Sequence, residues 1–119
     1  NVGAYIESNV GIGTSSPSSK LEVSGSLATK YTATATGITL DATHCVVNVT
    51  ATGQTITLPT ASGITGRQYT IKLTASGSCT IDGNASETID GATTYSLASQ
   101  YKYVTIVSDG SNWIITANN

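Results

Sequence analysis

The sequence offers few residues for nucleophilic or acid–base chemistry, since it holds one histidine, His44, and two cysteines, Cys45 and Cys79. A serine–histidine–acid site needs a histidine that is oriented by a carboxylate. The nearest carboxylate in sequence is that of Asp41, and two strand residues that are three apart point to opposite faces. We therefore expect no catalytic residues and no enzymatic activity.

A second candidate chemistry is calcium binding by the segment that begins at Asp82, where oxygen-bearing side chains recur. Its sixth and twelfth positions are Glu87 and Thr93, whereas a calcium loop of the EF-hand type has glycine and glutamate there. Two turns, at residues 82–84 and 90–91, account for the same residues more simply. The cysteines also lack the spacing of a zinc site, so we expect no metal and no cofactor.

Two cysteines and two asparagines are candidate sites of covalent modification. Cys45 and Cys79 form either a disulfide or two free thiols, and a disulfide between their predicted strands needs Cα atoms within ~7 Å. Triplets that match the N-glycosylation acceptor start at Asn48 and Asn84. Asn84 is the better acceptor of the two, because it falls in a predicted turn.

Three aromatic residues near the end of the chain, Tyr101, Tyr103 and Trp113, are candidates for a carbohydrate-binding platform, since flat aromatic rings stack on sugars. The alternative is structural: Tyr103 and Trp113 would form a cross-strand pair on either side of a turn at residues 109–110. We favour the cross-strand pair, because single exposed aromatic residues are ordinary on protein surfaces.

The composition restricts the classes of function. The chain has 119 residues, the size of one domain, and only 10% of them are charged, against about 25% in ordinary globular proteins. Its five basic residues are scattered, and nucleic-acid binding needs them clustered, so we expect no nucleic-acid partner. Because no apolar run reaches about 18 residues, we expect no membrane insertion.

From Tyr31 to the end of the chain, short segments alternate between apolar and polar residues. The alternation predicts that these side chains point inward: Ile56, Leu58, Tyr69, Ile71 and Leu73. Glycine-containing turns separate the segments, and Asp109-Gly110 gives the strongest hairpin signal. The pattern predicts an all-β fold, a small antiparallel β-sandwich or prism of about eight or nine strands, without a helix.

Residues 1–30 differ from the β-rich domain predicted at residues 31–119. Glycines and a proline interrupt them, and they contain one predicted short strand, Leu21–Val23. Because it has so few apolar side chains, we expect this segment not to fold alone but to be an extended connector or assembly segment that a partner surface orders. The chain begins at Asn1 rather than at methionine, which indicates a processed chain or a fragment.

Two stretches of the sequence resemble known proteins. Residues 9–25, NVGIGTSSPSSKLEVSG, are similar to the NVGIGTxxPxxKLEVxG segment of bacteriophage tail fibres and related bacterial surface proteins. The second stretch includes ITLPTA, YTIK, TIDGNASETIDG and VTIVSDGSNW, and resembles a β-rich module that recurs in phage tail-fibre proteins. Together the two stretches span nearly the whole chain.

The resemblance implies a structural segment of a trimeric tail fibre, extracellular or on a virion surface, near a tip that binds a cell-surface glycan or protein. An alternative is a subunit of a polymeric extracellular filament, in which residues 1–30 complete the sheet of the next subunit by strand addition. A third reading is a monomeric carbohydrate-binding module. In the first two readings the main partner of the chain is another copy of itself, as a homotrimer or a polymer.

Overall fold

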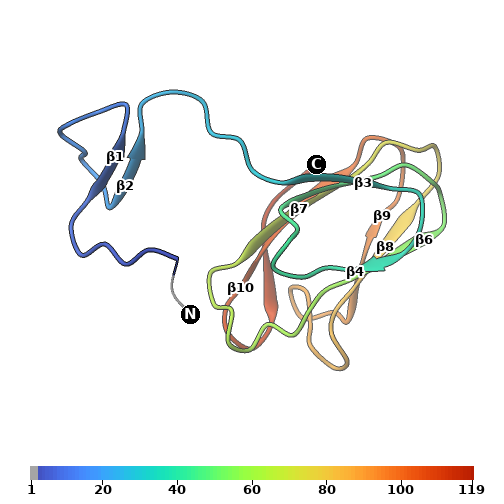
Figure 1. The fold of residues 1–119 in the computed structure, drawn as a ribbon. Coiled ribbons are helices and arrows are strands. Elements are labelled where there is room, and N and C mark those ends of the chain that lie inside the picture. The colour runs from blue at the N-terminus through green and yellow to red at the C-terminus, as the bar shows by residue number, and fades with distance from the viewer. Residues whose placement is uncertain (1–2) are drawn as a thin grey trace.

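A computed structural model describes residues 3–119, which form eleven strands in three sheets and no helix (Figure 1). The predicted all-β class is confirmed. The strands are β1 (Val10–Ile12), β2 (Leu21–Val23), β3 (Tyr31–Thr34), β4 (Ile38–Thr39), β5 (Val46–Val49), β6 (Gln54–Thr57), β7 (Gln68–Leu73), β8 (Cys79–Asp82), β9 (Thr94–Leu97), β10 (Tyr103–Ser108) and β11 (Trp113–Asn118). The predicted strand at Leu21–Val23 is present as β2, whereas the preceding β1 was expected to be loop.

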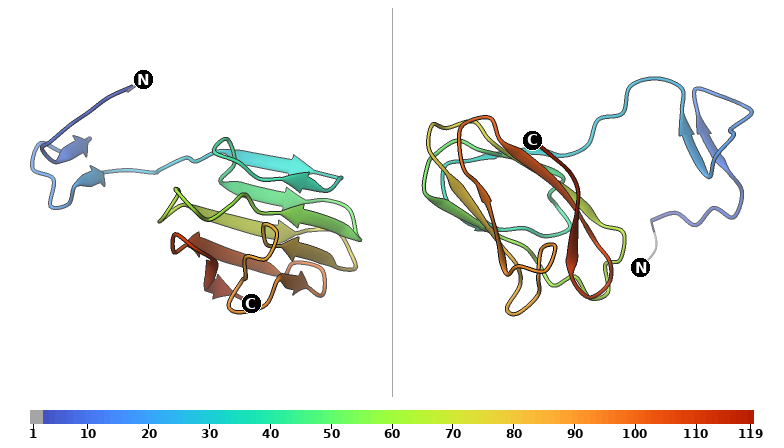
Figure 2. Two further views of the ribbon diagram at one scale, coloured as in Figure 1. Left: turned by 90° about the horizontal axis from the view of Figure 1, so that it is seen from below. Right: turned by 180° about the vertical axis from the view of Figure 1, so that it is seen from behind.

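Two sheets enclose the core. The five-stranded sheet has the order β11-β10-β7-β5-β3, and the four-stranded sheet has the order β4-β6-β8-β9. From β3 to β8 the chain alternates between these sheets, so that β3 with β4, β5 with β6 and β7 with β8 make three stacked coils (Figure 2). After β8 the chain reverses, and β9, β10 and β11 complete the two sheets as antiparallel strands.

The predicted antiparallel arrangement is wrong for most of the fold, because five of the eight strand pairings are parallel. The strands also number eleven rather than eight or nine, with nine of them in the two larger sheets. Parallel sheets are usually buried on both faces and read as continuous apolar runs. Here each larger sheet buries one face only. A strand with one buried face alternates whichever way its neighbour runs, so the pattern does not give strand direction.

The core lies between the two larger sheets, and its aliphatic side chains are stacked in register. Ile56 and Ile81 are partners in the four-stranded sheet, and Val47, Ile71 and Val104 are successive partners in the five-stranded sheet. The residues that were predicted to point inward are fully buried: Ile56, Leu58, Tyr69, Ile71 and Leu73. Burying one such side chain contributes about 1.5–3 kcal/mol, so the stacked rows are the main source of stability.

The hairpin predicted at Asp109-Gly110 is confirmed, since β10 and β11 are antiparallel neighbours on either side of it. Gly110 has a φ of +98°, a value that residues with a side chain rarely adopt. The Asp109 carboxylate accepts hydrogen bonds from the backbone N–H groups of Asn112, at 2.7 Å, and Ser111, at 2.9 Å. These two bonds hold the pKa of Asp109 below its usual value.

The third sheet is a pair of parallel strands, β1 and β2, that stands apart from the two larger sheets (Figures 1 and 2). Parallel strands usually need a connection of about a dozen residues or more, whereas residues 13–20 join these two. Polar contacts hold the short connection. The Glu22 carboxylate accepts hydrogen bonds from the N–H of Ser18, at 2.6 Å, and from its hydroxyl, at 2.9 Å. The first of these bonds has the larger effect in lowering the pKa of Glu22.

The assignment of faces in the four-stranded sheet can be tested on neighbouring residues of β8. Ile81 is fully buried, whereas Thr80 points to the outer face. Ile81→Ala should lower the free energy of unfolding by about 2–5 kcal/mol, because it leaves a cavity in the core. The matched change Thr80→Ala should alter it by no more than about 0.5 kcal/mol. Urea unfolding of both variants measures the difference, and equal losses would contradict the register.

Candidate functional site

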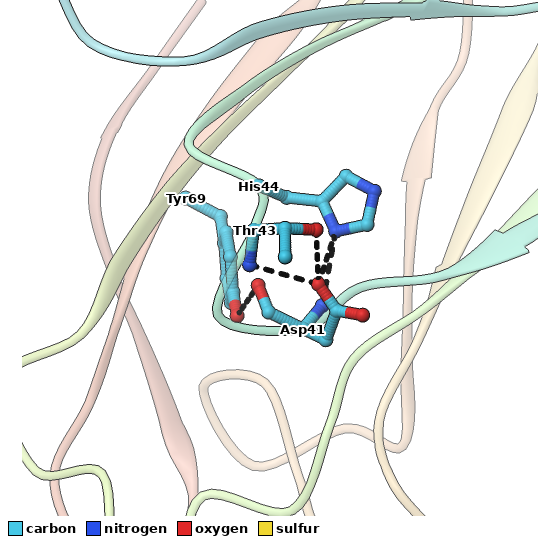
Figure 3. A network of polar contacts seen from close by, with 4 residues as sticks. All are labelled: Asp41, Thr43, His44 and Tyr69. Carbon is cyan, nitrogen blue, oxygen red and sulfur yellow. Dashed lines mark hydrogen bonds and ion pairs between the residues drawn. The ribbon is translucent and has the colours of Figure 1, made fainter. Parts of the chain in front are cut away.

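A polar network surrounds Asp41 in the turn between β4 and β5 (Figure 3). The Asp41 carboxylate accepts hydrogen bonds from the Thr43 hydroxyl, at 2.6 Å, and from the Thr43 backbone N–H, at 2.8 Å. The Tyr69 hydroxyl reaches the turn from β7 and donates to the backbone carbonyl of Asp41 at 2.8 Å. The side chain of an aspartate thus closes the turn on its own backbone, as aspartates commonly do.

His44 lies beside Asp41, which corrects the expectation that the two point to opposite faces. The segment is a turn, since the His44 N–H donates to the Asp41 carbonyl at 3.1 Å. The His44 Nδ1 lies 3.0 Å from the Asp41 carboxylate oxygen Oδ1 and 3.1 Å from the Asp41 backbone nitrogen. Nδ1 accepts from that N–H when it carries no proton, and it donates to the carboxylate when it carries one. Every contact in this network holds the turn, which is the arrangement of a structural cap.

Trp113 does not belong to a surface platform, because its side chain is fully buried against Tyr69, with 5.7 Å between ring centroids. Its indole Nε1 has no hydrogen-bond partner among the described residues. The expected cross-strand pair of Tyr103 and Trp113 is also wrong. Trp113 is paired with Ser108, whereas Tyr103 lies at the other end of β10 and is paired with Lys72 of β7.

Lys72 brings two of the three predicted aromatic residues together. Its ammonium group lies 5.5 Å from the ring centroid of Tyr103 and 5.8 Å from that of Tyr101, which is within cation–π range. It also donates a hydrogen bond to the Tyr101 carbonyl. Sequence reasoning missed Lys72. Its outward direction follows from the buried Ile71 and Leu73 beside it, but its contact with Tyr103 depends on the pairing of β7 with β10.

Tyr101 occupies the third position of a turn in which the Lys102 N–H donates to the Ser99 carbonyl at 3.2 Å. Its φ is +68°, in the left-handed region where glycine is usual and other residues are strained. The Tyr101 N–H donates to the Leu73 carbonyl at 2.7 Å, and its own carbonyl accepts from Lys72 and from Asn119. These contacts hold the strained residue while 58% of its surface stays exposed.

The two thiols are free, so the candidate disulfide is not formed in this structure. Cys45 is half-buried and directly precedes β5 of the five-stranded sheet, whereas Cys79 is buried and begins β8 of the four-stranded sheet. Burial raises the pKa of the Cys79 thiol to about 11. Cys79 is therefore protonated at neutral pH and serves as a small apolar core residue.

The two candidate glycosylation sites lie in different surroundings. The Asn48 side chain is engaged at both ends within the sheet: it donates to the Tyr31 hydroxyl at 3.0 Å and accepts from the Thr74 hydroxyl at 2.7 Å. Asn84 lies in a turn, as predicted, and its carbonyl accepts from the Glu87 N–H at 2.8 Å. A glycan on Asn48 would break contacts within the fold, so Asn84 stays the better acceptor.

In the segment that begins at Asp82, the Glu87 side chain is engaged within the protein. The Glu87 carboxylate accepts hydrogen bonds from the Thr60 hydroxyl, at 2.6 Å, and from the Ala61 N–H, at 2.9 Å. It thereby ties this loop to the one after β6. Within residues 3–119 the structure has no group of three or more histidine, cysteine, aspartate or glutamate side chains arranged to hold a metal ion.

No protein-family model matches this sequence, and no curated protein matches it closely enough to be called a relative. Over the described part of the chain, no helix is long and apolar enough to cross a membrane.

The Asp41 turn should make stability depend on pH in the acid range. Hydrogen bonds from the Thr43 side chain and backbone hold the pKa of Asp41 below its usual value. Such a carboxylate stabilises the fold above its unfolded pKa of about 3.9, and this contribution is lost as the pH falls through the folded pKa. Asp41→Asn should therefore lower the urea midpoint near neutral pH, and the gap to wild type should close in acid. A gap that is constant with pH would contradict this account.

The two thiols should differ in reactivity. In native protein at mildly alkaline pH, Ellman's reagent should titrate Cys45 promptly and Cys79 only slowly, because Cys79 is buried and its pKa is about 11. In denaturant without reductant both should react. Cys45→Ser should abolish the prompt phase, which is the control. A failure of either thiol to react after denaturation would reveal a disulfide and overturn the assignment.

Proposed function

We propose that this chain is a structural segment of a trimeric, phage-type tail fibre, with no catalytic role. The motif at residues 9–25 suggests this function, and the exposed position of the β1–β2 sheet supports it. An isolated two-stranded sheet is marginal in water, and this one stands apart from the core. Three copies that associate through this part of the chain would cover the surface of the β1–β2 sheet that is exposed in one copy.

The distribution of exposed apolar side chains is the observation that carries the proposal. Among the described residues, five of the eight large hydrophobic side chains that are exposed lie before the start of β3: Tyr5, Ile6, Ile12, Leu21 and Leu27. Ile12 in β1 is 56% exposed and Leu21 in β2 is 59% exposed. Polar bonds set the shape of this sheet while its apolar side chains stay uncovered, which is typical of a surface that a partner covers.

The second candidate is an open filament assembled by strand addition. It is favoured by the edges of the two larger sheets, since β3 and β11 end one sheet and β4 and β9 end the other. An unpaired edge strand can accept a strand from another chain. In this reading residues 1–30 of one subunit would add to such an edge in the next subunit.

The native mass of the full chain in solution separates these readings. Light scattering should give about 36 kDa, three times the 12.1 kDa of one chain, and negative-stain images should show discrete short particles. An open-ended mass distribution with visible filaments would favour strand addition. A mass of one chain at every concentration would overturn both assembly readings and leave the monomeric carbohydrate-binding module.

A pair of substitutions locates the interface. Ile12→Ser with Leu21→Ser in one chain should convert the trimer to monomer, because it removes apolar side chains that a partner would cover. The matched control is Ile114→Ser on β11, which removes an apolar side chain that is 42% exposed on a larger sheet. The control should keep the trimer. Loss of the trimer in the control alone would place the interface on the five-stranded sheet.

A further inference from the structure

A strip of outward side chains crosses four strands of the five-stranded sheet. Lys72 of β7 is a register partner of both Asn48 on β5 and Tyr103 on β10. The Asn48 amide continues the strip to the hydroxyl of Tyr31 on β3. With strands about 4.8 Å apart, four strands extend the strip over about 14 Å. The name tyrosine strip is used below for Tyr31, Asn48, Lys72, Tyr101 and Tyr103.

Lys72 is the one charged residue in the five strands of this sheet. The four strands of the opposite sheet likewise contain one charged residue, Asp82, of the other sign. Among the residues of the tyrosine strip Lys72 alone is charged, and the others present rings, an amide and hydroxyls. Such a face can pair one carboxylate of a ligand with Lys72 while its rings, amide and hydroxyls contact the neutral parts of the same ligand.

Tyr101 at the end of the strip is held in a costly conformation. Its positive φ would suit glycine, yet a large ring is kept there, and its backbone groups are fixed by Leu73, Lys72 and Asn119. Strained residues persist where the surroundings determine them, and they gather at binding sites. Because Tyr101 is mostly exposed, its strain does not serve the core. The ring is instead held in position beside Lys72 and Tyr103.

We propose that the tyrosine strip binds a linear acidic polysaccharide. The C–H faces of its sugar rings would pack on Tyr101 and Tyr103, and a uronate carboxylate would pair with the Lys72 ammonium. Sugar hydroxyls would bond to the Asn48 amide and the Tyr31 hydroxyl. The described residues form no enclosed cavity, so an extended chain fits this face better than a small molecule that needs a pocket. The inference goes beyond the fibre role and does not depend on oligomeric state.

Affinity electrophoresis of the full chain tests the proposal, with polygalacturonate in the gel as the acidic polymer and dextran as the neutral one. Polygalacturonate should retard the wild type, and dextran should not. Lys72→Gln should weaken binding at least about tenfold, because it removes the charge pair and the cation–π contacts. The control Arg67→Gln removes the same charge just before β7, at the other end of that strand, and should change binding by less than about twofold.

Tyr101→Gly separates binding from folding. Glycine adopts the φ of this turn without strain, so the melting temperature should stay the same or rise, while binding should weaken at least about tenfold. Ala85→Gly, at a φ of +51° in a different turn, relieves similar strain and should leave binding unchanged.

Three results would overturn the proposal: no retardation of the wild type by polygalacturonate, equal retardation by dextran, or equal losses in Arg67→Gln and Lys72→Gln. Light scattering on the same samples reports the oligomeric state separately. A monomer that binds polygalacturonate would support the tyrosine strip as a binding site and contradict the trimeric fibre. A trimer that does not bind it would support the fibre and contradict the binding site.

Discussion

Parallel register between successive coils is the constraint on which the larger part of the molecule depends. Each coil contributes one strand to each of the two larger sheets, and the aliphatic side chains of both strands must face the core between them. A slip of one residue in any coil would turn its buried row outward. The turns that link the two sheets, here called corners, keep the same register as the strands. The Gly53 N–H of one corner donates to the Ser78 carbonyl of the next at 2.7 Å, and a side chain on Gly77 would collide with Thr52.

The sequence predicts well those features that depend on one strand at a time. Alternation identifies the buried faces of Ile56 and Ile71, and the turn residues identify the hairpin at Asp109. It fails where the outcome depends on which strands are neighbours. Parallel and antiparallel strands alternate alike when one face is buried, so the antiparallel direction that the pattern predicts is wrong for most of the strand pairs. The predicted pair of Tyr103 and Trp113 is wrong for a different reason: the hairpin register places Ser108 opposite Trp113, and Tyr103 is paired with Lys72 of β7.

The candidate site shows the same limit in a local form. In a strand Asp41 and His44 would diverge, because they are three residues apart, but Thr43 and Tyr69 stabilise a turn that brings them within 3.0 Å. Residue types at this position are compatible with a turn, but they do not determine how tightly the chain bends between Asp41 and His44. Tyr101 is a second case. Nothing in its type predicts a left-handed backbone, because that conformation is imposed by contacts with Leu73, Lys72 and Asn119.

The coil stack also bears on how such a molecule changes length over evolution. The three coils repeat the same order of strands, and the antiparallel strands that end the stack pair with its last coil, through β7 and β8. Duplicating one coil in the middle would extend both sheets while leaving each end with the neighbours that it has now. Insertions in multiples of a whole coil should therefore be tolerated, whereas insertions of part of a coil would break the register. Length in this architecture is a quantity that can be adjusted in discrete steps, independently of the surfaces at either end.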